Sequence, residues 1–221
     1  MAKAAAGLVN LVALVGLMLF GAAGTLRFVE GWVFLATFFG ASLAITLYLA
    51  KADPALLERR TQAGPVAEKE RRQKIIQGLA SALFLATIVI PGLDHRFGWS
   101  RAPLAVAVAG DALVLVGFLA VFLVFRENTF TSSIIEVAPD QRAIDTGPYA
   151  VVRHPMYAGA LLLVAGIPLA LRSILGLVVL PPFVAVLVWR LLDEERFLRA
   201  HLAGYSAYCQ KTRWRLVPRV W

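Results

Sequence analysis

Residues 102–125 read APLAVAVAGDALVLVGFLAVFLVF and carry one charged side chain, Asp111. A helix needs about 20 apolar residues to cross the hydrocarbon core of a bilayer, so this stretch predicts a membrane-spanning helix. The rest of the chain has the same character, because 59% of its 221 residues are hydrophobic, 16% are charged, and its mean hydropathy is +0.72. Soluble domains are about 45–50% apolar and about 25% charged. This composition excludes a soluble globular enzyme and a disordered chain as leading interpretations.

Six apolar segments follow one another along the chain. They cover Leu8–Gly24, Gly31–Ala50, Ile75–Leu93, Ala102–Phe125, Met156–Leu171 and Ile174–Leu192. Because only Arg172-Ser173 separates the short fifth segment from the sixth, we expect these two to form a helical hairpin whose tip lies near the opposite membrane surface.

The predicted fold class is all-α, a polytopic membrane helical bundle of about six apolar segments. We expect residues 1–125 to form a four-span region and residues 126–221 a C-terminal region of the same structural unit. The first segment resembles a signal peptide in length, but further apolar segments follow it at once. We therefore interpret it as a retained span.

Basic residues are distributed unevenly over the segments that connect the spans. With the N-terminus inside, 18 of the 22 Lys and Arg residues fall on the inner side, and only Arg27, Arg96, Arg101 and Arg172 on the outer side. The positive-inside rule then predicts that both termini and both long loops are cytoplasmic. The net charge of +8 is explained by this topology, so we expect no nucleic-acid partner.

Two further features bear on possible metal or disulfide chemistry and on the structure of the first long loop. The single cysteine, Cys209, allows neither an internal disulfide nor a Cys-based metal site, and the three histidines lie far apart in the sequence, so we expect no metal. Residues 51–74 are rich in charge of both signs, which predicts a polar interfacial helix pair broken at Gly64-Pro65.

Polar residues that could take part in binding or catalysis precede the fifth apolar segment. His154-Pro155 would open a membrane helix, where proline costs nothing because its missing N–H would be unpaired anyway. The free N–H groups of that first turn can hold a carboxylate or another anion. Tyr157 follows within the helix, and the turn at Gly147-Pro148-Tyr149 would place a second aromatic ring nearby.

A second polar group ends the sixth apolar segment. Arg190 and Glu194 are four residues apart and would share one face of a helix. Ionisable groups at a membrane boundary are costly and are candidates for function. The alternative is a simple ion pair at a helix end with a snorkelling arginine.

The ordered motifs of the C-terminal region resemble one enzyme family. GPYAVVRHPMYAG at 147–159, the Glu194-Glu195 pair and RWRLVP at 213–218 are similar in order and spacing to the isoprenylcysteine carboxyl methyltransferases and the related phospholipid methyltransferases, as a bacterial-type member. The resemblance covers about the last 90 residues. It implies an S-adenosylmethionine-dependent methyltransferase with a cofactor pocket that faces the cytosol and a lipid-like or small hydrophobic acceptor that enters from the bilayer.

The resemblance also implies roles for individual residues. The residues implied to contact the cofactor are Gln141, Arg142, Ala143, Ile144, Tyr149, His154, Pro155, Tyr157 and Glu194. Residues 141–144 would do so largely through their backbone. The implied catalytic residues are Arg190, Glu194 and His154, with Arg190 facing the acceptor.

The chemistry of these residue types fits the same reaction. Aromatic rings favour a sulfonium cation, Glu194 the ammonium group, and the helix start at His154-Pro155 the carboxylate. A carboxylate acceptor, as in an isoprenylcysteine-type substrate, is favoured because it needs no base, whereas an amine or thiol would need His154 or Glu195 as one. A small thiol, a lipid amine and an isoprenoid acid all remain open.

Two other functions are alternatives to the methyltransferase. Membrane sterol-type reductases have a similar C-terminal hairpin and would use NADPH. Arg142 and Arg153 could bind the 2′-phosphate of that cofactor. A non-catalytic membrane scaffold is the other alternative. It predicts that His154, Tyr157, Arg190 and Glu194 do not converge on one open pocket.

Overall fold

The structure is a computed structural model that describes residues 2–61, 64, 66–68, 70–138 and 141–221. The helices run in the order α1 (Ala2–Ala23), α2 (Val29–Ala52), α3 (Pro54–Thr61), α4 (Arg71–Phe97), α5 (Leu104–Glu127), α6 (Pro155–Ala170), α7 (Leu180–His201) and α8 (Tyr205–Lys211). Two short 3₁₀ helices, η1 (Gly147–Ala150) and η2 (Leu175–Val179), precede α6 and α7. The described residues contain no strand.

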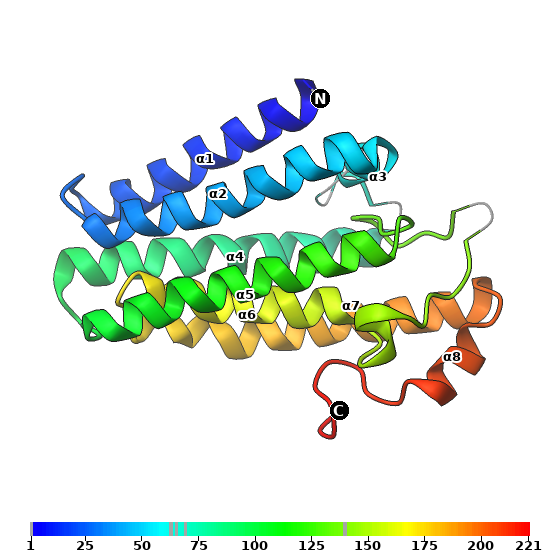
Figure 1. Ribbon diagram of the computed structural model, residues 1–221. Coiled ribbons are helices and arrows are strands. Elements are labelled where there is room, and N and C mark those ends of the chain that lie inside the picture. The colour runs from blue at the N-terminus through cyan, green and yellow to red at the C-terminus, as the bar shows by residue number, and fades with distance from the viewer. Residues whose placement is uncertain (1, 62–63, 65, 69, 139–140) are drawn as a thin grey trace.

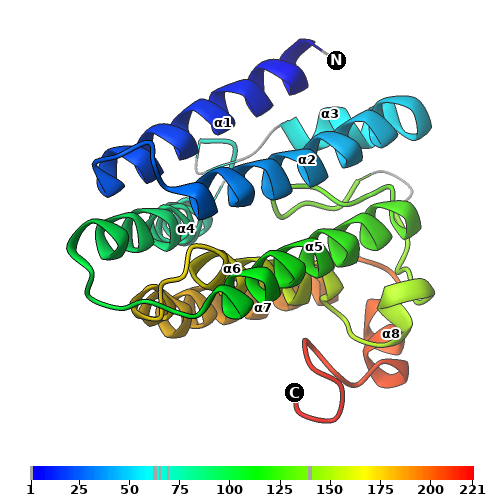
Figure 2. The same ribbon diagram turned by 60° about the vertical axis from the view of Figure 1, so that its left-hand side comes forward.

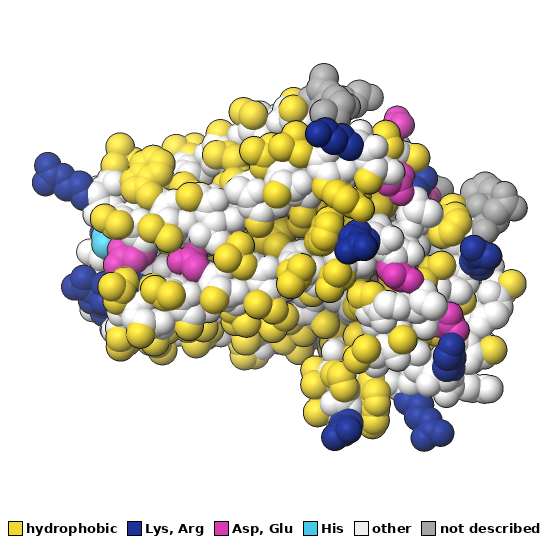
Figure 3. Space-filling view, viewed as in Figure 1, with side chains coloured by type: hydrophobic (Ala, Val, Ile, Leu, Met, Phe, Trp, Pro, Cys, Tyr) yellow, Lys and Arg dark blue, Asp and Glu magenta, His cyan; other side chains and the backbone are white. Residues whose placement is uncertain are grey.

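Five of these segments are long and apolar enough to cross a membrane: Ala4–Ala23, α2, α4, α5 and Leu175–His201. The sixth, α6, is apolar but only 16 residues long. Apolar side chains cover the middle of the face in Figure 3, while most charged side chains gather at its two ends. The predicted all-α polytopic membrane bundle is therefore confirmed, and the chain is an integral membrane protein.

The long helices pack in two layers (Figures 1 and 2). Helices α4 to α7 lie side by side, and α1 and α2 cover one side of them. Both chain termini lie at the end of the bundle that also carries α3 and α8. We call this the pocket end and the opposite one the far end.

Close packing of glycines joins α5 to α6. A Cβ atom added to Gly117 would lie 2.8 Å from the carbonyl oxygen of Gly159, and one added to Gly166 would lie 2.8 Å from that of Gly110. Membrane helices gain no hydrophobic driving force from each other, so small residues that allow close backbone contact stabilise their association. This pair of helices holds the start of α6 in a fixed position.

The tip of the α6–α7 hairpin is anchored at the far end. The Arg172 side chain donates to the carbonyl oxygen of Ala102 at 2.7 Å and forms an ion pair with Glu30 at 2.9 Å. Ala102 precedes α5 and Glu30 lies in the first turn of α2. The hairpin therefore runs from the pocket end to the far end, as the sequence predicted.

The structure corrects the predicted helix pair in residues 51–74. Its first helix is α3, but the described residues between α3 and Arg71 form no second one. Residues 71–74 instead form the first turn of α4, since no helix breaker separates them from Ile75. Gly64 lies in a bend with φ +88°, and Pro65 lies outside the described residues.

The sixth apolar segment also differs from its predicted bounds. The α-helix begins at Leu180, after the 3₁₀ turn of η2, and continues to His201, beyond the predicted end at Leu192. Pro181 in the first turn favours a helix start at this point. The polar continuation of α7 leads directly to the candidate site.

Candidate active site

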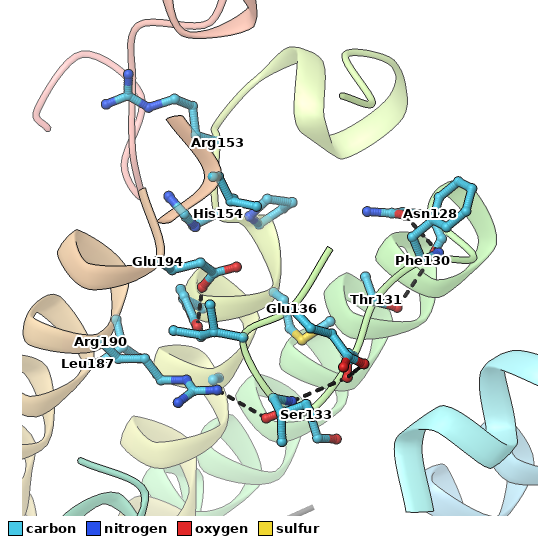
Figure 4. A pocket seen from close by; sticks show the side chains of 18 of the residues that line it. Asn128, Phe130, Thr131, Ser133, Glu136, Arg153, His154, Leu187, Arg190 and Glu194 are labelled. Carbon is cyan, nitrogen blue, oxygen red and sulfur yellow. Dashed lines mark hydrogen bonds between the residues drawn. The ribbon is translucent and has the colours of Figure 1, made fainter. Parts of the chain in front are cut away.

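A pocket of about 390 Å³ opens at the pocket end of the bundle. Its wall combines residues from 128–136 and 141–144, η1, the start of α6, the polar half of α7, and α8 (Figure 4). All ten residues assigned to the site from the sequence line it: Gln141, Arg142, Ala143, Ile144, Tyr149, His154, Pro155, Tyr157, Arg190 and Glu194. Their convergence is the opposite of what the scaffold alternative predicts.

The Gly-Pro-Tyr turn places Tyr149 on the wall. Gly147 has φ +55°, and a Cβ atom there would lie 2.6 Å from the carboxylate of Glu127 at the end of α5. The Tyr149 hydroxyl accepts a hydrogen bond from the amide of Asn128 at 3.1 Å, and its carbonyl oxygen accepts one from the Tyr208 hydroxyl at 2.9 Å. The turn is thus fixed between α5 and α8.

The Arg-His-Pro motif begins α6 and is fixed to the C-terminal tail. The backbone N–H groups of Arg153 and His154 donate to the carbonyl oxygens of Trp214 and Arg215 at 2.8 and 3.0 Å. His154 precedes α6, and Pro155 is its first residue, as predicted. The RHPxY and RWRLVP motifs, which are about 60 residues apart, therefore form one local structure.

Glu195 holds the basic residues of this motif. Its carboxylate lies 2.9 Å from Nε of Arg153, 3.3 Å from Nε2 of His154 and 3.2 Å from Nε of Arg215. The side chains of Arg153, His154 and Glu195 are each at most 6% exposed. Glu195 is not among the described residues that line the pocket, so it positions His154 from behind the wall.

Tyr157 and Glu194 meet inside the pocket. The Tyr157 hydroxyl donates to Oε2 of Glu194 at 2.5 Å, and the Tyr157 ring stacks on His154 with centroids 5.6 Å apart. In Figure 4, Glu194 points from α7 toward the segment that carries Ser133 and Glu136. A carboxylate and aromatic rings therefore share one part of the wall.

Arg190 lies one turn before Glu194 and already has a carboxylate partner. Its guanidinium lies 2.8 Å from Glu68, and it donates to the side chain of Gln73 at 2.9 Å and to the carbonyl oxygen of Ser133 at 3.0 Å. The Glu68 side chain is 3% exposed. Arg190 is thus ion-paired with Glu68 within a hydrogen-bonded network, and it also lines the pocket.

Residues 141–144 pass along the pocket without regular secondary structure. The Gln141 side chain accepts a hydrogen bond from the N–H of Ala138 at 2.8 Å. The Gln141 backbone N–H in turn donates to the carbonyl oxygen of Ala138 at 3.1 Å, so both of these groups are used locally.

Several lining residues were missed by the sequence analysis. Arg60 comes from α3, Tyr205 and Tyr208 come from α8, and the segment 128–136 adds Asn128 and Ser133. Arg60 had no signal in the sequence, because its role depends on α3 folding back over the pocket.

Apolar residues form another part of the wall. Ile76 and Ala80 of α4, Ala160 of α6, and Phe183, Val186 and Leu187 of α7 line the pocket on the side of the membrane-spanning helices. The pocket therefore has a polar and an apolar part, as predicted for a site that meets both the aqueous phase and the bilayer.

Burial changes the titration of the groups at the pocket end. Burial raises the pKa of the Tyr149 phenol to about 12, so it stays protonated at neutral pH. Burial also lowers the pKa of Arg60, which nevertheless remains charged, since an arginine pKa is above 12 in water. Burial likewise raises the pKa values of the Tyr205 and Tyr208 phenols.

Comparison with protein families adds evidence that is independent of this geometry. Residues 105–204 match the model of the phospholipid methyltransferase family. The matched range runs from α5 through α7 and includes the RHPxY motif, Arg190 and Glu194. It confirms the resemblance that the motifs predicted. A comparison with curated proteins finds no match.

Proposed function

We propose that this chain is a membrane methyltransferase that uses S-adenosylmethionine and methylates a lipid-like or small hydrophobic acceptor, since residues 105–204 match the model of the phospholipid methyltransferase family. The observation that carries this proposal is the convergence of Tyr149, His154, Tyr157 and Glu194 on one pocket within the matched range.

The composition of the pocket fits this cofactor. A volume of about 390 Å³ is within the usual range for cofactor sites. Glu194 supplies a carboxylate for an ammonium group, and Tyr149 and Tyr157 supply rings that favour a sulfonium. Tyr205 lines the pocket, and its buried hydroxyl has no hydrogen-bond partner among the described residues. A buried hydroxyl without a partner is costly, and a bound ligand with polar groups would satisfy it.

The residues contribute mainly by orientation and by excluding water. When bound, S-adenosylmethionine supplies a methyl group activated by a sulfonium leaving group. Methyl transfer is an in-line displacement, so it depends on alignment of two reactants in a dry site. Glu194 and the start of α6 would orient the cofactor, while the wall formed by Ile76, Phe183 and Leu187 would admit the apolar part of the acceptor and exclude water.

A carboxylate acceptor, as in an isoprenylcysteine-type compound, remains the favoured proposal. The two candidate bases are engaged with one another, since Nε2 of His154 lies 3.3 Å from Glu195, and Glu195 also forms an ion pair with Arg153. A carboxylate is already nucleophilic and needs neither base. Arg190 would position it at the boundary between the polar and apolar parts of the pocket.

We also propose that the pocket end faces the cytoplasm. Both termini and the long segments at that end carry most of the basic residues, which agrees with the positive-inside rule. Membrane lipids would then surround the bundle between its two charged ends.

Calorimetric titration of the detergent-purified protein with S-adenosylhomocysteine tests the cofactor, with NADPH titrated in parallel. We expect saturable binding of S-adenosylhomocysteine alone, weakened about 10-fold to 100-fold in Glu194→Gln because a charged hydrogen bond is lost. Arg190→Ala should reduce turnover rather than this affinity. Binding of NADPH alone would identify a reductase, and binding of neither would refute the proposal.

A further inference from the structure

Arg60 is a cation of the pocket wall that has no acidic partner among the described residues. It lies in the last turn of α3 and lines the pocket. Its Nη1 donates to the carbonyl oxygen of Ser132 at 3.0 Å and lies 3.9 Å from the sulfur of Met156. Its guanidinium lies over the Phe125 ring, 5.1 Å from the centroid. Among the described residues, no carboxylate forms an ion pair with it.

Two other arginines that line the pocket, Arg153 and Arg190, differ from Arg60 in this respect, whereas Arg142 is exposed. Arg190 is paired with Glu68 at 2.8 Å, and Arg153 is paired with Glu195 at 2.9 Å. Both pairs involve carboxylates that are at most 5% exposed. Their charges are therefore compensated within the protein, whereas the charge of Arg60 is compensated only by a carbonyl dipole and an aromatic ring.

A charge in this position is costly without a counter-ion. Burial of Arg60 disfavours its charged form, and Arg190 adds a like charge nearby. A guanidinium has five N–H groups, and the contacts with Ser132 and Met156 use only Nη1. Among the described residues, neither Nε nor Nη2 forms a hydrogen bond, so both are available to a ligand in the pocket that Arg60 lines.

The position of Arg60 adds a second source of positive potential. Met156 is the second residue of α6, so the guanidinium lies beside the start of that helix. The first N–H groups of a helix have no partner within it, and the helix dipole makes this end positive. An anion there would meet both the guanidinium and the start of α6.

We propose that Arg60 binds an oxyanion, a carboxylate or a phosphate, of a ligand in this pocket. This inference rests on the proposed function for the identity of the ligands. Two ligands carry such a group: the cofactor, through its amino-acid carboxylate, and the acceptor, through an anionic headgroup. A guanidinium forms paired hydrogen bonds with either oxyanion.

The test compares Arg60→Gln with Arg59→Gln in the purified full-length protein. Arg59 precedes Arg60 on α3, and it contacts Thr129 instead of lining the pocket. Its substitution removes the same charge and controls for the overall potential. Each protein is titrated with S-adenosylhomocysteine and with 5′-methylthioadenosine, which lacks the amino-acid part. Decyl phosphate and decanol form a second pair of probes for the acceptor side.

We expect Arg60→Gln to weaken binding of one anionic probe about 10-fold or more, with no change for its neutral counterpart and no effect of Arg59→Gln. Loss of S-adenosylhomocysteine affinity assigns the oxyanion to the cofactor, and loss of decyl phosphate affinity assigns it to the acceptor. Arg60→Lys keeps the charge and should restore part of the loss.

Unchanged affinity for both anionic probes overturns the inference, and so does an equal loss for the neutral probes, which would indicate a purely structural role. Failure of the unaltered protein to bind S-adenosylhomocysteine refutes the proposed cofactor, and Arg60 is then judged on decyl phosphate alone. If the unaltered protein binds neither anion, both proposals are overturned.

Discussion

Both ends of the bundle bury polar side chains, but the two ends differ in whether these side chains have partners within the protein. At the far end, the Asp94 carboxylate is 1% exposed and accepts three hydrogen bonds, two from Ser100 at 2.6 and 2.5 Å and one from Ser173 at 2.5 Å. At the pocket end, the Tyr205 hydroxyl has no partner among the described residues, and Arg60 has no counter-ion there. The Asp94 network is complete within the chain, whereas these groups at the pocket end are not.

This difference separates a stabilising network from a binding site. Asp94 joins the end of α4 to the tip of the α6–α7 hairpin, because Ser173 follows the turn at Arg172. A buried network in which each polar group has a partner stabilises one arrangement of the helices. Groups that lack partners cost stability, and their presence around a cavity indicates that a ligand completes them.

The largest effect on stability is expected at the far end. Asp94→Ala leaves the hydroxyls of Ser100 and Ser173 and one backbone N–H without an acceptor, so it should lower the free energy of unfolding by about 3–5 kcal/mol. Denaturation in mixed detergent micelles measures this change. Affinity for S-adenosylhomocysteine should stay within about twofold of the parent. A large loss of affinity with little loss of stability would contradict the division between the two ends.

Glu195 provides a sharper test, because it forms a buried ion-paired cluster at the pocket end. Glu195→Gln leaves Arg153 without a buried counter-ion but keeps one acceptor oxygen, so we expect a loss of about 2–3 kcal/mol of stability. The affinity for S-adenosylhomocysteine should fall less than in Glu194→Gln, since Glu194 lines the pocket and Glu195 does not. The reverse order would show that Glu195, rather than Glu194, contacts the ligand.

The fold could be predicted from the sequence where hydrophobicity alone decides the structure. Segments such as Ala102–Phe125 need only length and apolar character to be recognised as spans. The predicted ends of the helices were less accurate, because α4 and α7 continue into charged residues that hydrophobicity assigns to loops. The close packing of α5 on α6 was not predicted, since glycines spaced seven apart, at 110 and 117 and at 159 and 166, acquire meaning only when two helices are paired.

The site could be predicted from the sequence where its residues belong to ordered motifs. The ten predicted residues all line one pocket, although their contacts with a cofactor remain a proposal. Arg60 and the Arg190–Glu68 pair could not be predicted, because they depend on contacts between segments up to 122 residues apart that no spacing rule describes. Tertiary structure, rather than local pattern, decides which of two similar arginines has a counter-ion.

The smallest effect is expected from the surface pair Lys211–Asp145, which joins α8 to the segment that precedes Tyr149. The two side chains are 2.6 Å apart but are 64% and 41% exposed, and exposed pairs contribute little because water and salt screen them. The hydrogen bond from Lys211 lowers the pKa of Asp145. The pair therefore stabilises the fold above about pH 4, where an unfolded aspartate is ionised, and the contribution disappears as the pH falls through the lowered folded pKa.

Asp145→Asn should consequently show a small difference from the parent in the denaturation midpoint at pH 7, which disappears in strong acid and shrinks at 1 M NaCl. If Asp145→Asn lost as much stability at pH 7 as Asp94→Ala, an exposed ion pair would contribute as much to stability as a buried network. The contrast between the two ends would then reflect the position of charges rather than their burial and pairing.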